Sequence, residues 1–149
     1  MPSQVRLLAA PFDPGAELAA FTGGQPYAGG VVSFLGQVRS GGGVEALELR
    51  HFEPLTLPGM QDLAAQALAR WRLDGLLVIH RTGLLHPGDP IVLVATAARH
   101  RRDAFAAAEF VMDHLKSESW FWKRECAGGA WHWIEPRAVD FADLARWEK

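Results

Sequence analysis

The sequence has 149 residues, of which 49% are hydrophobic and 21% charged, and its net charge is −2. Such a chain is long enough to bury a core, so a single domain over residues 1–149 is expected. The net charge gives no support for non-specific nucleic-acid binding, so any positive site must be local, and no apolar run reaches the ~20 residues that a membrane span needs. With one cysteine, Cys126, and no secretory signal, a cytoplasmic protein without an internal disulfide is expected.

Strands and helices alternate along the first half of the chain. Asp13 followed by Pro14 is typical of a helix start, and the alternation of apolar and polar side chains after Val44 indicates a half-buried strand. The expected elements are a strand at 4–9, a helix from Asp13 to residues 22–24, a buried strand at 29–38, a glycine-rich break at 39–43, a half-buried strand at 44–52, a loop at 54–59 and a helix at 60–71.

The second half repeats this mixture and ends in a hairpin. The expected elements are a strand at 76–81, a turn at 86–89, a central strand at 91–97, a helix at 103–116, strands at 120–125 and 131–135 joined through 127–130, and a closing helix at 141–147. Apolar residues recur at helical spacing in the third helix and predict its buried stripe: Ala104, Ala108, Val111, Met112 and Leu115. The pattern as a whole predicts an α+β fold, with part of a sheet left for a partner.

Cationic side chains gather around the third predicted helix. His100, Arg101 and Arg102 precede it, Lys116 ends it, and Lys123 and Arg124 follow on the next strand. A helix N-terminus attracts anions, so cations there are explained by a bound anion. We therefore expect an anion site. The alternative is a set of exposed side chains, with Lys116 paired to Asp113 and either Lys123 or Arg124 solvated, because neighbours on a strand face opposite ways.

Two further residues leave alternatives open. Arg39 ends an apolar strand before three glycines, so it can serve either an anion site or an ordinary turn. Cys126 can be a nucleophile, but no resolving cysteine accompanies it, which favours a structural thiol. The six histidines show no metal-binding spacing, and no phosphate-binding glycine motif is present. The sequence predicts no metal site.

Taken together, several segments resemble the MoaE family, the large catalytic subunits of molybdopterin synthase. The resemblance covers roughly residues 29–137, and its order and spacing make it specific. The matching segments are VVSFLGQVR at 31–39, VIHRTGLLHPGD at 78–89, HR at 100–101, FVMDHLK at 110–116, FWKRE at 121–125 and W-I-E at 133–135. The sequence departs from the family at Trp120, where proline is common, and in the glycine-rich loop after Arg39.

The resemblance implies an α/β-hammerhead-type fold and a sulfurtransferase. Two sulfurs would pass from the C-terminal Gly-Gly thiocarboxylate of a small ubiquitin-like subunit to cyclic pyranopterin monophosphate, giving the molybdopterin dithiolene with no further cofactor. The large subunits would form a homodimer, and with the small subunits a heterotetramer. The residues implied are Lys116 and Lys123 as catalytic groups, Gln37, Val38, Arg39, His100, Arg101, Arg124 and Glu125 as substrate-binding groups, and Phe34, Met112 and Arg137 as possible additions.

The cationic residues agree with this implication, because the substrate is a phosphate ester and needs a local positive site in an acidic chain. A rival hypothesis is a non-catalytic module that binds a ubiquitin-like tail or an anionic ligand. A third hypothesis, a phosphoester-processing enzyme, lacks the metal ligands that such chemistry commonly uses.

Overall fold

The structure, a computed structural model, describes residues 2–117, 120–135 and 138–148. These residues form two four-stranded sheets and four α-helices, which confirms the α+β class. The elements are β1 (Ser3–Leu8), α1 (Pro14–Gly23), β2 (Gly30–Gln37), β3 (Val44–His51), α2 (Glu53–Arg70), β4 (Gly75–Arg81), β5 (Gly83–Leu85), β6 (Pro90–Ala98), α3 (Arg101–Ser117), β7 (Phe121–Ala127), β8 (Ala130–Ile134), α4 (Ala138–Ala145) and a 3₁₀ turn at Arg146–Glu148.

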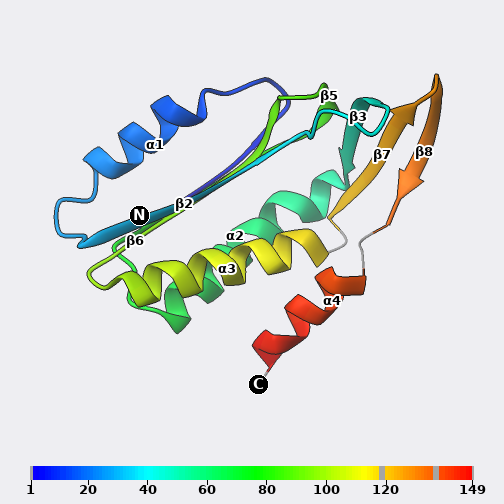
Figure 1. Cartoon of the computed structure of the whole chain (residues 1–149). Coiled ribbons are helices and arrows are strands. Elements are labelled where there is room, and N and C mark those ends of the chain that lie inside the picture. The colour runs from blue at the N-terminus through cyan, green and yellow to red at the C-terminus, as the bar shows by residue number, and fades with distance from the viewer. Residues whose placement is uncertain (1, 118–119, 136–137, 149) are drawn as a thin grey trace.

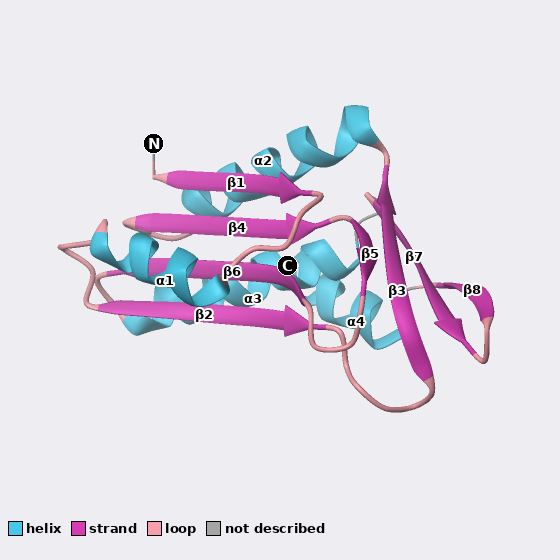
Figure 2. Ribbon diagram, turned by 90° about the horizontal axis from the view of Figure 1, so that it is seen from above, coloured by secondary structure: helices cyan, strands magenta, loops and turns pink. Residues whose placement is uncertain are grey.

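The first sheet has the strand order β1-β4-β6-β2 and is covered by helices on both faces (Figure 2). β1 runs parallel to β4, and the other neighbours are antiparallel. Strand β4 is buried along its whole length, and β6 is buried except at its first two residues, which confirms that the 91–97 run is central. Helix α1 lies on one face, and α2 and α3 lie on the other (Figure 1).

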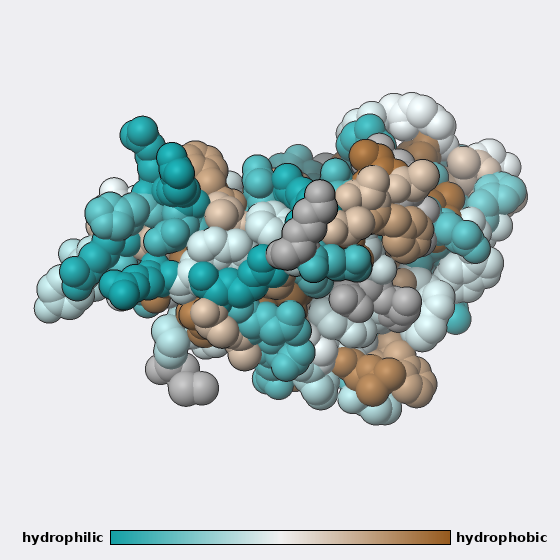
Figure 3. All heavy atoms as spheres, turned by 90° about the horizontal axis from the view of Figure 1, so that it is seen from below, coloured by the Kyte–Doolittle hydropathy of each residue, from teal (hydrophilic) through white to brown (hydrophobic). Residues whose placement is uncertain are grey.

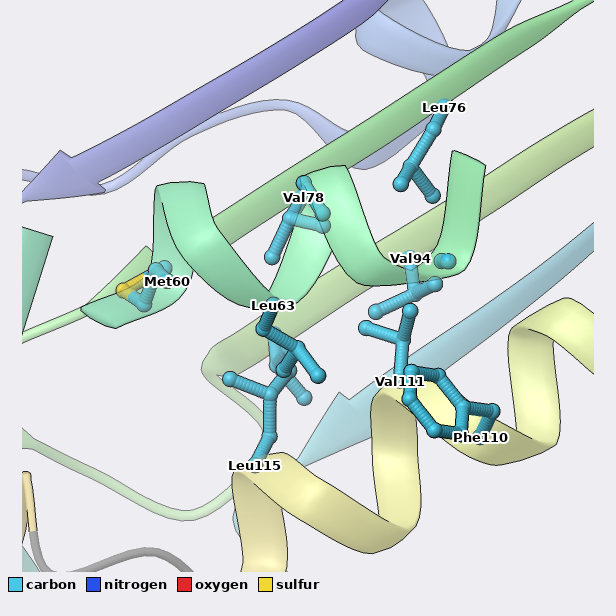
Figure 4. Close-up of a cluster of buried hydrophobic side chains, with 11 residues drawn as sticks. Met60, Leu63, Leu76, Val78, Val94, Phe110, Val111 and Leu115 are labelled. Atoms are coloured by element: carbon cyan, nitrogen blue, oxygen red, sulfur yellow. The ribbon is translucent and has the colours of Figure 1, made fainter. Parts of the chain in front are cut away.

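The main core lies between this sheet and the pair α2 and α3 (Figure 4). Leu63 of α2 and Val111 of α3 meet Val78 and Val94 of the central strands. Phe110, which the predicted stripe of α3 omitted, is 1% exposed and is among the largest fully buried side chains. The buried face of α3 is therefore wider than the predicted stripe, because this helix packs against both the first sheet and α2.

The second sheet, of order β5-β3-β7-β8, crosses the ends of the first-sheet strands (Figure 2). Val38, Leu47, Leu49 and Leu85 form its small core, against which Ile91 packs. The predicted hairpin is confirmed, with β7 and β8 paired through a turn at Gly128 and Gly129, where φ is positive at both residues. Helix α3 ends where the two sheets meet (Figure 1).

Three expectations about the elements were wrong. Residues 54–59 are not a loop but the first turns of α2, where Pro54 occupies a position whose N–H needs no intrahelical partner. The strand at 29–38 is not buried, because β2 is an edge strand whose outer residues face no further strand. The short strand β5 was not expected, since three residues carry no detectable period.

Among the described residues, no helix is both long and apolar enough to cross a membrane.

Candidate functional site

A cavity of about 500 Å³ lies where the loop after β2, the end of α3 and strand β7 come together. Three cationic side chains line it, Arg39, Lys116 and Lys123, together with the carboxylate-bearing Glu125. The sequence contains three lysines in all, so two of them meet in this one cavity. Its other lining residues are Gln37, Val38, Ser40, Gly41, Gly42, Val44, Leu47 and Ile91.

Arg39 is positioned by the residue that precedes it. Val38 is 6% exposed, its N–H donates to the carbonyl of Asp89 at 3.0 Å, and its carbonyl accepts from the N–H of Gly88 at 2.8 Å. These bonds fix the end of the strand against the predicted turn at 86–89. The chain then passes through three glycines with φ of 95°, 66° and 79°, a conformation that other residues rarely adopt. The glycine-rich loop therefore bends at the rim of the cavity and leaves Arg39 in its wall.

Lys123 is positioned by the start of β7. The carbonyl of Trp120 accepts from the N–H of Phe52 at 3.3 Å and from the hydroxyl of Thr56 at 3.3 Å. The Trp120 ring lies so close to Gly59 that a Cβ there would stand 2.5 Å from it. Helix α2 thus holds the beginning of β7, and residues two apart on the strand, Lys123 and Glu125, face the cavity together.

Lys116 lies in the last turn of α3, and the preceding Leu115 is buried in the main core, which fixes the rotation of the helix. The carboxylate of Asp113 contacts Arg146 at 2.7 Å and the indole N–H of Trp147 at 2.6 Å, so the alternative pairing of Asp113 with Lys116 is not formed. Lys116 also lines a second, smaller cavity of about 190 Å³. Phe34 and Met112, the additional candidates, lie in that cavity.

The charges around Lys123 lower its pKa below the ordinary value. Partial removal from water is the main cause, and the positive charges of Lys116 and Arg39 act in the same direction, whereas Glu125 and Asp140 oppose them. A lysine whose pKa is lowered exchanges a proton near neutral pH more readily than an ordinary one. The site therefore combines fixed positive charge with a group able to give or take a proton.

Arg124 and Cys126 lie on the opposite face of the second sheet from Lys123. Arg124 donates to both carboxylate oxygens of Glu48 at 3.1 and 3.2 Å and lies over the rings of Trp131 and Trp133. The hydrogen bonds from Arg124, and then from Arg50, lower the pKa of Glu48. Arg124 is therefore engaged in the structure of the hairpin and does not line the cavity. The thiol of Cys126 contacts Glu45 at 3.8 Å.

The structure does not bring His100 and Arg101 to the cavity. Both are exposed at the beginning of α3, whereas Lys116 is in its last turn. Lys116 is 15 positions after Arg101, which corresponds to about 22 Å along a helix. Hydrophilic side chains gather at the end of the molecule where α3 begins, as Figure 3 shows. The expectation that the cationic side chains gather in one cluster is thus wrong within one chain, because the length of α3 separates those at its beginning from those at its end. Arg137 lies outside the described residues.

Sequence reasoning missed two acidic residues. Asp140 and Asp143 of α4 line the smaller cavity beside Lys116, and no spacing in the sequence connects the closing helix with α3. Their approach depends on tertiary packing, so no local pattern could have identified them. Among the described residues, no three His, Cys, Asp or Glu side chains gather as a metal site.

Comparisons with known proteins give a consistent result. The MoaE protein family model matches residues 7–118. A molybdopterin synthase catalytic subunit from Ralstonia nicotianae is 47% identical over 146 residues, which cover 96% of this chain and 83% of the relative. A protein of the same name from Cereibacter sphaeroides is 46% identical over 145 residues, covering 97% of this chain and 99% of the relative.

Solved structures agree with this assignment. The molybdopterin biosynthesis MoaE protein from Burkholderia ambifaria has a TM-score of 0.83 and 42% identity, with 99% of each chain covered. A protein–protein complex of subunits 1 and 2 of molybdopterin-converting factor from Helicobacter pylori shares the fold, with a TM-score of 0.77 at 18% identity over 89% of this chain and 91% of the other. On the extent of these matches, the chain belongs to the MoaE family.

Proposed function

We propose that this chain is the catalytic subunit of a molybdopterin synthase, which transfers two sulfurs from the thiocarboxylate of a small partner to cyclic pyranopterin monophosphate. The observation that carries the proposal is the cavity of about 500 Å³ that contains Arg39, Lys116, Lys123 and Glu125 in a chain of the MoaE family. Cavities of this size hold small molecules. The reaction uses the pyranopterin as substrate and needs no further cofactor.

Binding of the substrate rests on the cationic wall of the cavity. Arg39 offers a planar fork of donors that matches a phosphate, and the glycine-rich loop beside it lets the ligand approach the backbone. Gln37 supplies further polar contacts, and Val38 holds the arginine in place. These groups orient the pyranopterin relative to the two lysines, and orientation is itself a large part of catalysis.

The chemistry rests on the two lysines. Attack by a thiocarboxylate sulfur develops negative charge on oxygen and requires protons to move on the pterin. A lysine held beside the reacting atoms stabilises the oxyanion, and one with a lowered pKa also transfers protons. Lys123 fits the second role because its pKa is lowered, and Lys116 fits the first.

The sulfur donor is a small ubiquitin-like subunit whose C-terminal Gly-Gly thiocarboxylate enters the cavity. The Helicobacter pylori complex, which shares this fold, contains two subunits of molybdopterin-converting factor. Phe34 and Met112 make the smaller cavity partly apolar, which suits the extended tail of such a partner.

Two copies of this chain with two small subunits form the heterotetramer. We also propose that it works in the cytoplasm, where its one cysteine stays reduced.

His100 and Arg101 enter the site from a second copy of the chain. They lie about 22 Å from Lys116 along α3, so the same chain cannot supply both groups to one ligand. A two-fold homodimer lets the beginning of one α3 approach the cavity of the other chain. Arg137 remains a predicted additional substrate contact.

The test incubates the chain with thiocarboxylated small subunit and cyclic pyranopterin monophosphate and measures dithiolene formation. The proposal expects product in proportion to the thiocarboxylate supplied. The rival hypothesis of a non-catalytic binding module expects a stable complex with the small subunit and no sulfur transfer, and that outcome would overturn the proposed function.

A further inference from the structure

Helix α4 is anchored firmly against the end of α3. The guanidinium of Arg146, just after α4, donates to the Asp113 carboxylate at 2.7 Å and to that of Glu109 at 3.3 Å. The Trp147 ring packs edge-on against Trp71 and Phe110, with ring centroids 5.6 and 5.5 Å away. These contacts tie the end of the closing helix to the main core, so α4 has a defined position beside the last turn of α3.

This anchoring places Asp140 beside both lysines. Asp140 lines the smaller cavity together with Lys116. Its backbone carbonyl accepts from the hydroxyl of Ser117, the residue next to Lys116, at 2.9 Å. Its negative charge also acts on Lys123. A carboxylate from a separate helix is therefore held near both proposed catalytic groups.

We propose that Asp140 is a positioning residue that orients Lys116 and Lys123 for sulfur transfer and keeps the Lys123 ammonium group charged. The role of the lysines rests on the proposed function, whereas the electrostatic effect of Asp140 on Lys123 does not.

The charges that face Lys123 explain why the cavity needs such a group. Lys116 on α3 and Arg39 on the glycine-rich loop repel the Lys123 ammonium, and removal from water disfavours it further. Glu125 on β7 and Asp140 on α4 are the groups that oppose this. Glu125 shares a strand with Lys123 and moves with it. Asp140 is supplied by another element, so it can balance the positive charges around Lys123 independently of β7.

The test follows the NMR signals of the lysine side chains, which are few enough to be assigned individually. Lysine labelled with ¹³C at Cε gives one NMR signal for each of the three lysines, and Lys116→Arg and Lys123→Arg variants assign two of them. Each signal reports the protonation of its own ammonium group as the pH is raised. In Asp140→Asn, we expect the titration of Lys123 to move to lower pH than in the parent chain.

Asp143→Asn is the matched control, because it removes the same charge from the same helix at a residue that influences Arg146 and not Lys123. We expect Lys123 to titrate at the same pH as in the parent chain both in Asp143→Asn and in Asp140→Glu. If Asp140→Asn fails to fold, Ser117→Ala replaces it, since loss of the bond to the Asp140 carbonyl should give a smaller shift in the same direction. Unchanged lysine titrations in the folded variants would overturn the proposal.

Activity measurements separate this inference from the proposed function. The ratio of dithiolene formation by Asp140→Asn to that by the parent chain should change with pH, whereas a merely structural role would lower the rate equally at every pH. A parent chain that forms no dithiolene, with a lysine shift still present in Asp140→Asn, would overturn the proposed function and support the electrostatic role of Asp140.

Discussion

At the scale of single residues, the two cavity lysines carry the most direct prediction. Lys116→Ala and Lys123→Ala should each fold and bind the small subunit, but lose roughly 100-fold or more in rate, as expected when a group that stabilises an oxyanion is removed. Lys116→Arg should rescue little, because arginine differs in shape and does not readily release a proton. Arg39→Ala should mainly weaken substrate binding. Single-turnover dithiolene formation with pre-formed thiocarboxylate measures each effect.

The control for these variants is Arg50→Ala, which removes a cationic side chain that is 59% exposed and pairs with Glu48 outside the cavity. It should keep the parental rate. Parental turnover by both lysine variants would contradict the catalytic assignment and favour the binding-module hypothesis.

Cys126 is predicted to be dispensable for sulfur transfer. Its side chain faces away from Lys123 on β7, and in the proposed reaction the sulfur arrives on the partner's tail. Cys126→Ser should therefore retain most dithiolene formation in the assay used for the lysines. Loss of activity in a folded Cys126→Ser protein would point instead to a persulfide carried by this chain.

His80 should make the fold sensitive to acid. It is buried, its ring stacks on Phe121 with centroids 4.0 Å apart, and burial lowers its pKa from 6.5 to about 4. Because the unfolded chain takes up the proton first, the free energy of unfolding should decrease as the pH falls from 6.5 to about 4, by about 3 kcal/mol from this residue. Denaturant titrations between pH 7 and pH 4 measure this loss.

His80→Gln provides the comparison, since glutamine does not titrate. It should be less stable than the parent at pH 7 but lose less stability between pH 6.5 and 5. Glu17 and Glu48 affect stability in a different pH range. The pKa of each carboxyl is lowered from 4.5, so each contributes stability that is present above pH 4.5 and is lost at lower pH. An equal slope in both proteins above pH 5 would show that His80 is not the source.

At the scale of elements, local patterns predicted most of the fold. The apolar run of β6, the cap at Asp13 and the glycine turn of the hairpin each carry a signal within a few residues. The start of α2 carries no such local signal, because its two prolines indicate a loop. Tertiary contacts, such as the hydrogen bond of Thr56 with Trp120, hold this segment in the helix. The division of the strands into two sheets depends on long-range pairing, which no local period encodes.

The same limit applies to the site. Arg39, Lys116, Lys123 and Glu125 were predicted from motifs and do line one cavity. The sequence could not show that Arg124 would bind Glu48, because either of two neighbouring strand residues could have faced the ligand. It could not place Asp140 either, since α4 reaches Lys116 through contacts made by its own C-terminal flank.

The anchor of α4 gives a prediction at this scale. Trp147→Ala removes a ring that packs against Trp71 and Phe110 and a hydrogen bond to Asp113, so it should lower the free energy of unfolding by about 2 kcal/mol. Val139→Ala on the same helix, at a residue 47% exposed, should change it by less than about 0.5 kcal/mol. Denaturant midpoints compare the two, and equal effects would mean that α4 is not held by its flank.

At the scale of the whole molecule, exposed aromatic side chains indicate a surface that another chain covers. Trp122, Trp131 and Trp133 are 48%, 38% and 58% exposed on one face of the second sheet. Isolated exposed rings are ordinary, but a group of them on one sheet face is typical of an interaction site. We therefore expect a homodimer in solution at micromolar concentration, which sedimentation would detect.

A two-fold dimer with shared sites has a consequence that single variants cannot reveal. Lys116→Ala and Arg101→Ala should each reduce dithiolene formation when present in both chains. In a mixed dimer, the chain with intact lysines receives Arg101 from its partner, so one of the two sites is complete. Random mixing of equal amounts should therefore restore about a quarter of the parental activity. Tagged chains isolated as mixed dimers measure this directly. If the mixed dimer is no more active than the two variants, Arg101 does not act in the partner's cavity, and each site is built from one chain alone.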